Sequence, residues 1–250
     1  MMLAKRGLGD GDVACVVGRA LEAVPGAGRL NVAGNAIGVA GVEKLAARVR
    51  KLQVRPALRV LHLGMNAGLG DEGVRAVCDW VGQEGGIGAS LEALSLAGCG
   101  VGDAGAKAVA GLLLREGKVP QLKVVDLSLN AIGDEGAIHL SEAVPALSSL
   151  LLRGNSIGNR GARVLALRLL DAPGLQRLNV EGNTFGGPVA ELFETTWLDR
   201  SQGLVLPTYE SHDRAAPTSA VEEGEEQEDG DDDDSDDDPD GGWVTEGSSE

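Results

Sequence analysis

The chain lacks several features that define common functional classes. It has only three cysteines, and Cys15, Cys78 and Cys99 do not have the spacing of a metal site. No apolar run approaches the roughly 20 residues of a membrane span, and the first eight residues lack the apolar stretch of a signal peptide. These features predict reduced, structural thiols and a cytoplasmic or nuclear location.

Aromatic residues and basic clusters are scarce as well. The 250 residues include 2 Phe, 1 Tyr and 3 Trp. No strong cluster of Lys or Arg is present, so the sequence gives nucleic-acid binding little support. His62 falls on an expected strand face without a convincing nucleophile beside it, and no catalytic triad, carboxylate dyad or metal cluster is evident. We therefore predict a protein that is not an enzyme and that uses no cofactor or metal.

The sequence does contain one short pattern in six copies between residues 27 and 187. The pattern is L-x-x-L-x-L-x-x-N, and the clearest copy continues as I-G-D-E-G from Ile132 to Gly136. At the three leucine positions, 17 of 18 residues are Leu or Val, Ala27 being the exception. This spacing predicts a short strand with one buried face, followed by an anchor amide that turns inward to pair with backbone groups. The anchors, at steps of 31, 33, 31, 25 and 28 residues, are Asn35, Asn66, Cys99, Asn130, Asn155 and Asn183.

A helix is expected after each strand, because apolar residues recur there at intervals of three and four, as in Val42, Leu45, Ala46 and Val49. This strand–helix unit, together with the I-G-D-E-G-A signature, resembles the ribonuclease-inhibitor type of leucine-rich repeat. The resemblance covers about residues 1–200. It implies an α/β solenoid, a right-handed strand–helix horseshoe with a parallel sheet on its concave face.

The two ends of the array differ. We expect a leucine-rich-repeat domain over residues 1–206, with about six repeats, a partial N-terminal repeat and a C-terminal cap. Met1 and Leu3 fall on strand positions, so the chain is expected to begin inside a strand, through a truncated gene model or the loss of an upstream segment. At the other end, Phe185, Phe193 and Trp197 are expected to cover the last repeat.

Residues 207–250 form a segment of different composition. Their formal charge is −17, against +1 for residues 1–206. Such a segment cannot bury enough apolar surface to fold, so we predict a disordered acidic tail. The tail serves either as a solubilising segment or as an arm that binds basic partners. Ser235, surrounded by aspartates, is either a site for an acidophilic kinase or a simple interruption of the acidic run.

Two segments, Gly68–Gly73 and Gly100–Gly105, match the dinucleotide fingerprint G-x-G-x-x-G. The second and third glycines of each match recur in other repeats, where they serve the tight turn from strand to helix. Asp71 and Asp103 would also place carboxylates where a pyrophosphate should bind. We therefore favour a structural role for these glycines over dinucleotide binding.

The side chains at positions −6, −4 and −2 from each anchor should point to the concave face. From these we predict a partner-binding surface, which is expected to favour the polar half from Asp126 to Glu181; the alternative is an ordinary solvated sheet face. The candidate residues are Arg29, Asn31, His62, Asp126, Ser128, Arg153, Arg177, Asn179 and Glu181.

Repeats with I-G-D-E-G turns followed by an acidic tail are also similar to the Ran GTPase-activating proteins. That resemblance implies stimulation of GTP hydrolysis by a small nuclear-transport GTPase. We predict first a protein–protein interaction scaffold, second such a GTPase activator, and third an acidic binder of basic proteins such as histones. The expected partner is another protein, not nucleic acid or a membrane.

Overall fold

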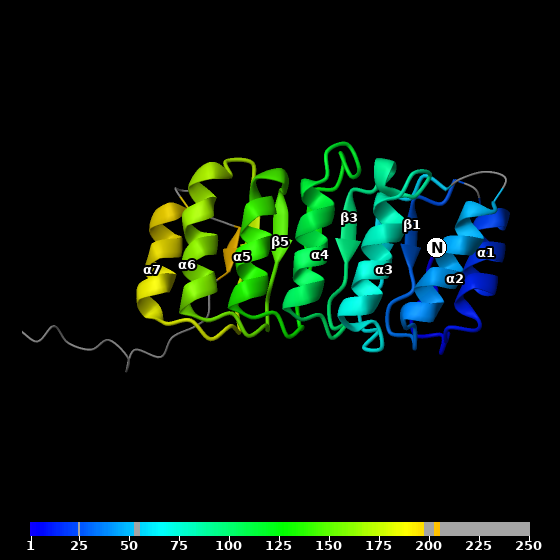
Figure 1. Cartoon of the computed structure of the whole chain (residues 1–250), viewed down its shortest axis with the longest axis horizontal. Helices are drawn as coiled ribbons and strands as arrows, with labels where there is room; N and C mark the ends of the chain where they lie inside the picture. The colour runs from blue at the N-terminus through cyan, green and yellow to red at the C-terminus, as the bar shows by residue number, and fades with distance from the viewer. Residues whose placement is uncertain (25, 53–55, 198–202, 206–250) are drawn as a thin grey trace, which may run out of the picture. The chain divides into compact units, whose positions relative to one another are not determined.

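The computed structural model describes residues 1–24, 26–52, 56–197 and 203–205, all within the compact unit Met1–Arg214. Strands and helices alternate along this part of the chain (Figure 1). The strands are β1 (Arg29–Asn31), β2 (Val60–His62), β3 (Ala93–Ser95), β4 (Val124–Asp126), β5 (Ser149–Leu151), β6 (Arg177–Asn179) and β7 (Leu204–Val205). The α-helices are α1 (Val13–Ala23), α2 (Val39–Arg50), α3 (Gly70–Gly82), α4 (Asp103–Leu114), α5 (Asp134–Ala143), α6 (Asn159–Arg168) and α7 (Gly187–Thr196). Short 3₁₀ turns η1 (Gly88–Ser90), η2 (Val144–Ala146) and η3 (Leu169–Asp171) precede β3, β5 and β6.

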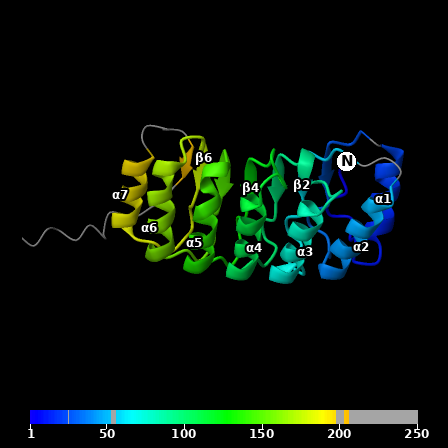
Figure 2. The ribbon, with the colours of Figure 1, turned by 45° about the horizontal axis from the view of Figure 1, so that its top comes forward.

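The seven described strands form one parallel sheet in the order β1 to β7. Figures 1 and 2 show the helices as one layer and the strands as another. Neighbouring strands are about 4.8 Å apart, whereas packed helices need about 8–10 Å. These spacings favour curvature with the sheet on the inside. The parallel sheet with its layer of helices confirms the predicted strand–helix solenoid. None of the helices in the described ranges is long and apolar enough to cross a membrane.

The core lies between the two layers and is continuous from repeat to repeat. The middle residue of each strand from β1 to β6 is buried, and its neighbours point outward. Each buried branched side chain contributes roughly 1.5–3 kcal/mol, so stacked repeats supply a core that no single repeat has. At the C-terminal end Phe185 and Phe193 are buried with ring centroids 5.5 Å apart. The strand β7, which pairs with β6, was not predicted.

The anchor asparagines connect consecutive repeats, as the sequence predicts. Asn66 is fully buried. Its Nδ2 donates to the Leu63 carbonyl at 2.6 Å and to the Val32 carbonyl of the preceding repeat at 3.1 Å. Its Oδ1 accepts from the Ile37 N–H, also in the preceding repeat, at 3.1 Å. One amide therefore satisfies backbone groups in two repeats, and Asn35, Asn130, Asn155 and Asn183 make equivalent bonds.

Cys99 interrupts this ladder, and a longer turn compensates for it. Its Sγ lies 3.3 Å from the Leu63 carbonyl and takes the donor role of the amide. A thiol offers no equivalent of the amide oxygen to the preceding repeat. The turn after Asn66 contains one extra residue, and the Leu69 N–H donates instead to the Asn66 carbonyl at 3.0 Å. The Leu69 N–H is therefore paired even though a cysteine replaces the asparagine at position 99.

Candidate functional site

The outward face of the sheet carries two rows of side chains that the strand register aligns across the repeats. In the first row Arg29 is followed by Val60, Ala93, Val124, Ser149 and Arg177. In the second row Asn31 is followed by His62, Ser95, Asp126, Leu151 and Asn179. A third set, two residues beyond each strand, includes Ser128, Arg153 and Glu181.

The nine predicted partner-binding residues do not form one cluster. Arg29 and Arg177 occupy the same row but lie on β1 and β6, with four strands between them. Arg29, His62, Arg153 and Arg177 are exposed, and the other five are half-buried. Asn31 and Asn179 each accept a hydrogen bond at 3.0 Å from the backbone N–H two residues ahead. These two amides therefore also shape the chain at the ends of their strands.

The residues from Asp126 to Glu181 do come together on neighbouring repeats. Arg153 Nε lies 3.2 Å from Glu181 Oε2 in a solvent-accessible ion pair. Asp126 accepts from the Ser128 N–H at 3.0 Å and from Ser95 Oγ at 3.2 Å. Such a cluster offers a partner both signs of charge and several polar groups on one rigid sheet.

Contrary to the expectation for His62, a hydroxyl is its cross-strand neighbour, because the register aligns it with Ser95. Asp126 lies next along the same row. In a serine–histidine–carboxylate relay the histidine lies between the other two groups. Here the serine lies between them and donates to the carboxylate. The row therefore does not have the geometry of that relay.

Sequence reasoning missed two apolar residues at the edge of this face. Met65 and Leu129 immediately precede their anchors and are 60% and 58% exposed. Both have left-handed backbones, with φ of 59° and 57°. Glycine occupies the same position, also at positive φ, in the other four complete repeats, at Gly34, Gly98, Gly154 and Gly182, and Lys5 occupies it in the partial N-terminal repeat, with φ of 53°. The departure from glycine was visible in the sequence, but its conformational meaning required the structure.

Comparison with known proteins agrees with this architecture. The family described as "Leucine Rich repeat" matches residues 29–46, 56–78, 89–110 and 120–141. A ribonuclease inhibitor from Sus scrofa is 34% identical over 143 residues, which are 56% of this chain and 30% of that protein. A ribonuclease inhibitor from Mus musculus is 30% identical over 151 residues, 58% of this chain and 32% of that protein. The chain therefore contains leucine-rich repeats, and over the aligned residues it is similar to the ribonuclease inhibitors.

Two further similarities complete the comparison. The "NACHT, LRR and PYD domains-containing protein 14" of Mus musculus is 31% identical over 158 residues, 62% of this chain and 15% of that protein. A crystal structure of an internalin from Listeria monocytogenes gives a TM-score of 0.39 at 16% identity, covering 73% of this chain and 47% of that one. This leucine-rich-repeat chain spans about a third or less of the length of these curated relatives. Its resemblance to the Ran GTPase-activating proteins stays a prediction.

The fingerprint-like glycines donate their backbone N–H groups to a carboxylate from the neighbouring repeat. Asp71 Oδ1 accepts from the N–H groups of Gly102 and Gly105, at 2.6 and 2.9 Å, at the start of α4. The carboxylate at this helix start therefore comes from the preceding repeat, and not from Asp103 of the same segment as predicted, because the helices stack side by side. The same bridge recurs from Asp103 to Gly133 and Gly136 and from Asp134 to Gly158 and Gly161.

The cysteines divide into one exposed and two buried thiols. Cys15 is exposed, and Cys78 and Cys99 are buried. Burial raises the pKa of Cys78 to about 12, with Asp79 adding to the effect and Arg115 opposing it. Burial also raises the pKa of Cys99. No group of three or more potential metal-binding side chains is found among the described residues.

We expect iodoacetamide at pH 8 to alkylate a single thiol in the native protein, because thiolates react and the two buried thiols stay protonated. Intact-mass analysis should show one adduct in buffer and three in urea. The Cys15→Ser variant should show none in buffer. Rapid modification of Cys78 or Cys99 in the native protein would contradict the burial described above.

Proposed function

We propose that this protein is a scaffold that binds another protein through the outward face of its sheet, between Met65 and Glu181. The observation that carries the proposal is the pair of exposed apolar residues at positive φ, Met65 and Leu129, at the edge of that face. A left-handed backbone costs a residue other than glycine about 1–2 kcal/mol. Four other repeats avoid that cost with glycine, so the two side chains are retained despite a penalty in the free protein.

The neighbourhood of these residues supports a protein partner. A Cβ built on Gly98 would lie 2.6 Å from Met65 Sδ, and one built on Gly154 would lie 2.9 Å from Leu129 Cδ2. Each apolar side chain therefore lies across the glycine of the next repeat and presents its other side to solvent. With the polar groups of Asp126, Arg153 and Glu181 nearby, the face combines apolar anchors with a charged surround, as protein interfaces do.

Three classes of partner follow from the resemblances. The name "ribonuclease inhibitor" describes two relatives as proteins that act on a ribonuclease. The formal charge of the chain, −16, favours a basic partner by electrostatic steering. Two basic proteins, a ribonuclease and a histone, serve as probes for binding of a basic partner. A Ran-type GTPase tests the activity implied by repeats that precede an acidic segment.

The test compares the wild-type protein with a Met65→Gly/Leu129→Gly double variant as bait in an extract of the source cells. We expect the double variant to lose partners that the wild type retains, by about tenfold or more, because apolar anchors dominate binding energy. Its free energy of unfolding should change by no more than about 1 kcal/mol per site, since glycine relieves the backbone strain. Leu167→Ala, at an apolar residue of similar exposure on α6, is the matched control.

Equal recovery of every partner by the wild type and the double variant would reject this face as the binding surface. The three probes are then titrated individually by calorimetry, using the full chain. For the GTPase, hydrolysis is followed with the protein at micromolar concentration beside an authentic activator. Binding without acceleration supports the scaffold and removes the activator, whereas acceleration supports the activator.

A further inference from the structure

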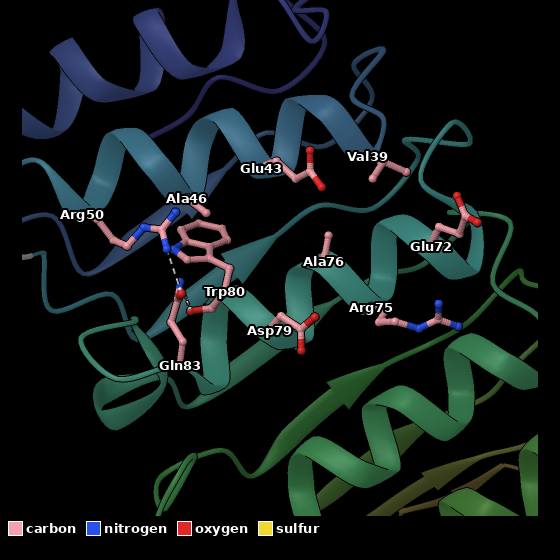
Figure 3. Close-up of a pocket in the computed structure, with 10 residues that line it drawn as sticks. All are labelled: Val39, Glu43, Ala46, Arg50, Glu72, Arg75, Ala76, Asp79, Trp80 and Gln83. Atoms are coloured by element: carbon pink, nitrogen blue, oxygen red, sulfur yellow. Dashed lines mark hydrogen bonds between the residues drawn. The ribbon is translucent and has the colours of Figure 1, made fainter.

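A groove on the helical layer is a second candidate binding site, separate from the sheet face. It has a volume of about 460 Å³ and lies between α2 and α3. Figure 3 shows Val39 and Ala46 on α2 facing Ala76 and Trp80 on α3, with charged side chains around them. The groove therefore has an apolar floor and a charged rim.

The groove coincides with a missing bridge between repeats. Val39 occupies the sequence position where Asp10, Asp71, Asp103 and Asp134 provide the carboxylate that reaches the next helix. The valine side chain cannot accept hydrogen bonds from the N–H groups at the start of α3. The Gly73 N–H donates instead to the carbonyl of Leu69, the residue before α3. Val39 itself lines the groove. Loss of the carboxylate bridge explains why the opening is at this junction.

Trp80 provides a hydrogen-bond donor without an acceptor in this groove. The side chain is 2% exposed, and its Nε1 is a buried polar atom without a hydrogen-bond partner. A buried donor left unpaired is costly, so such groups usually have a partner or a functional reason. Figure 3 shows the nitrogen-bearing edge of the indole turned toward Arg50. Arg50 donates to Gln83 Oε1 at 3.0 Å, an exposed hydrogen bond that can open at little cost.

The rim of the groove is predominantly acidic. Glu43 lies on α2, and Glu72 and Asp79 lie on α3, all three exposed. Within the described part of the chain, none of these carboxylates forms an ion pair. Arg50 and Arg75 also line the groove, so its charged groups sum to −1. An anionic occupant would face three unpaired carboxylates, whereas a cationic occupant would be attracted to them.

We propose that this groove binds a short extended segment of a partner protein in which an apolar residue is flanked by Lys or Arg. The apolar side chain packs against Trp80, Ala46 and Ala76. When Arg50 moves aside, a backbone carbonyl of the segment accepts the hydrogen bond from Trp80 Nε1. The basic side chains lie against Glu43, Glu72 and Asp79. The proposal stands independently of the sheet face.

The probe is the blocked peptide Ac-Gly-Lys-Leu-Arg-Leu-Lys-Gly-NH2, titrated into the full-length protein by calorimetry at 150 mM salt. Two matched peptides replace Leu by Ser, or Lys and Arg by Glu. We expect only the first peptide to bind at the groove, and Glu72→Gln/Asp79→Asn to weaken its binding several-fold. Glu142→Gln, an exposed charge change on α5, should have no effect. The acidic C-terminal segment is present in every protein variant, so its contribution is the same when the variants are compared with one peptide.

A second readout follows the indole N–H itself. In a ¹H–¹⁵N spectrum, the Trp80 signal, assigned by its absence in Trp80→Phe, should shift downfield on addition of the peptide as Nε1 gains an acceptor. Trp80→Phe should weaken binding about three- to tenfold, the effect of one lost hydrogen bond. Each of four results would overturn the proposal. The serine peptide could bind as well as the leucine peptide, or the glutamate peptide could bind better. The groove variants could have the same effect as Glu142→Gln, or the indole signal could stay unmoved.

Discussion

Replacing Asn66 by leucine is expected to lower the free energy of unfolding by about 3 kcal/mol or more. The substitution leaves the Ile37 N–H without its side-chain acceptor in a fully buried site. It also removes the Asn66 donor from the Val32 and Leu63 carbonyls, which keep the Asn35 amide and the Cys99 thiol, and each lost hydrogen bond costs about 0.5–1.5 kcal/mol. Each buried group left unpaired costs about 1–3 kcal/mol. Urea denaturation followed by circular dichroism at 222 nm measures the change.

The matched control is Asn31→Leu, the same substitution on the outward face. Asn31 accepts one hydrogen bond, from the Ala33 N–H at 3.0 Å, and is only half-buried. We expect it to lower the free energy of unfolding by about 1 kcal/mol at most. Equal denaturation midpoints for the two variants would contradict the role assigned to the inward-facing asparagines.

Replacing Asp103 by alanine is expected to cost about 2 kcal/mol. Asp103 Oδ1 accepts from the Gly133 and Gly136 N–H groups, at 2.7 and 2.9 Å, at the N-terminus of α5. Loss of an N-terminal cap costs about 0.5–2 kcal/mol, and the carboxylate adds a favourable interaction with the helix dipole. Asp103→Asn keeps an acceptor but removes the charge, so its denaturation midpoint should lie between those of the wild type and Asp103→Ala.

The control for charge is Glu135→Ala, one residue into the same helix. Glu135 pairs with Arg160 at 2.6 Å, but both side chains are more than half exposed. Removing such a pair should change the free energy of unfolding by less than about 1 kcal/mol. If Glu135→Ala were as destabilising as Asp103→Ala, general surface charge rather than the bridge between repeats would explain the effect.

The spacing of the repeats was sufficient to predict most of the fold. A strand alternates its side chains with a period of two and a helix with a period of 3.6, so the leucine positions and the helix faces could be assigned residue by residue. Asn130 and its counterparts were recognised because a polar residue within an apolar repeat must pair with backbone groups. Repeats contact only their neighbours, so these local assignments extended to the whole array.

The candidate site was predicted less completely. The strand positions identified which residues face outward, including Arg153 and Glu181, but not that these two form an ion pair. Exposed Met65 and Leu129 were not singled out, because their importance lies in a left-handed backbone. Ser235 and the acidic segment at 207–250 lie outside the described residues, so the predictions made for them, including the domain boundary at 206, stay predictions.

The sequence by itself determined the repeat register, the buried faces and the inward asparagines, since each follows from local spacing and the need to pair buried polar groups. Contacts between one repeat and the next were decided only by the tertiary structure. Asp71 caps the following helix, and the extra residue near Gly68 compensates for Cys99. The unpaired Trp80 N–H at the opening beside Val39 likewise depends on how α2 and α3 pack. These features depend on distances between residues about 30 positions apart, which the stacking of repeats sets and no single repeat encodes.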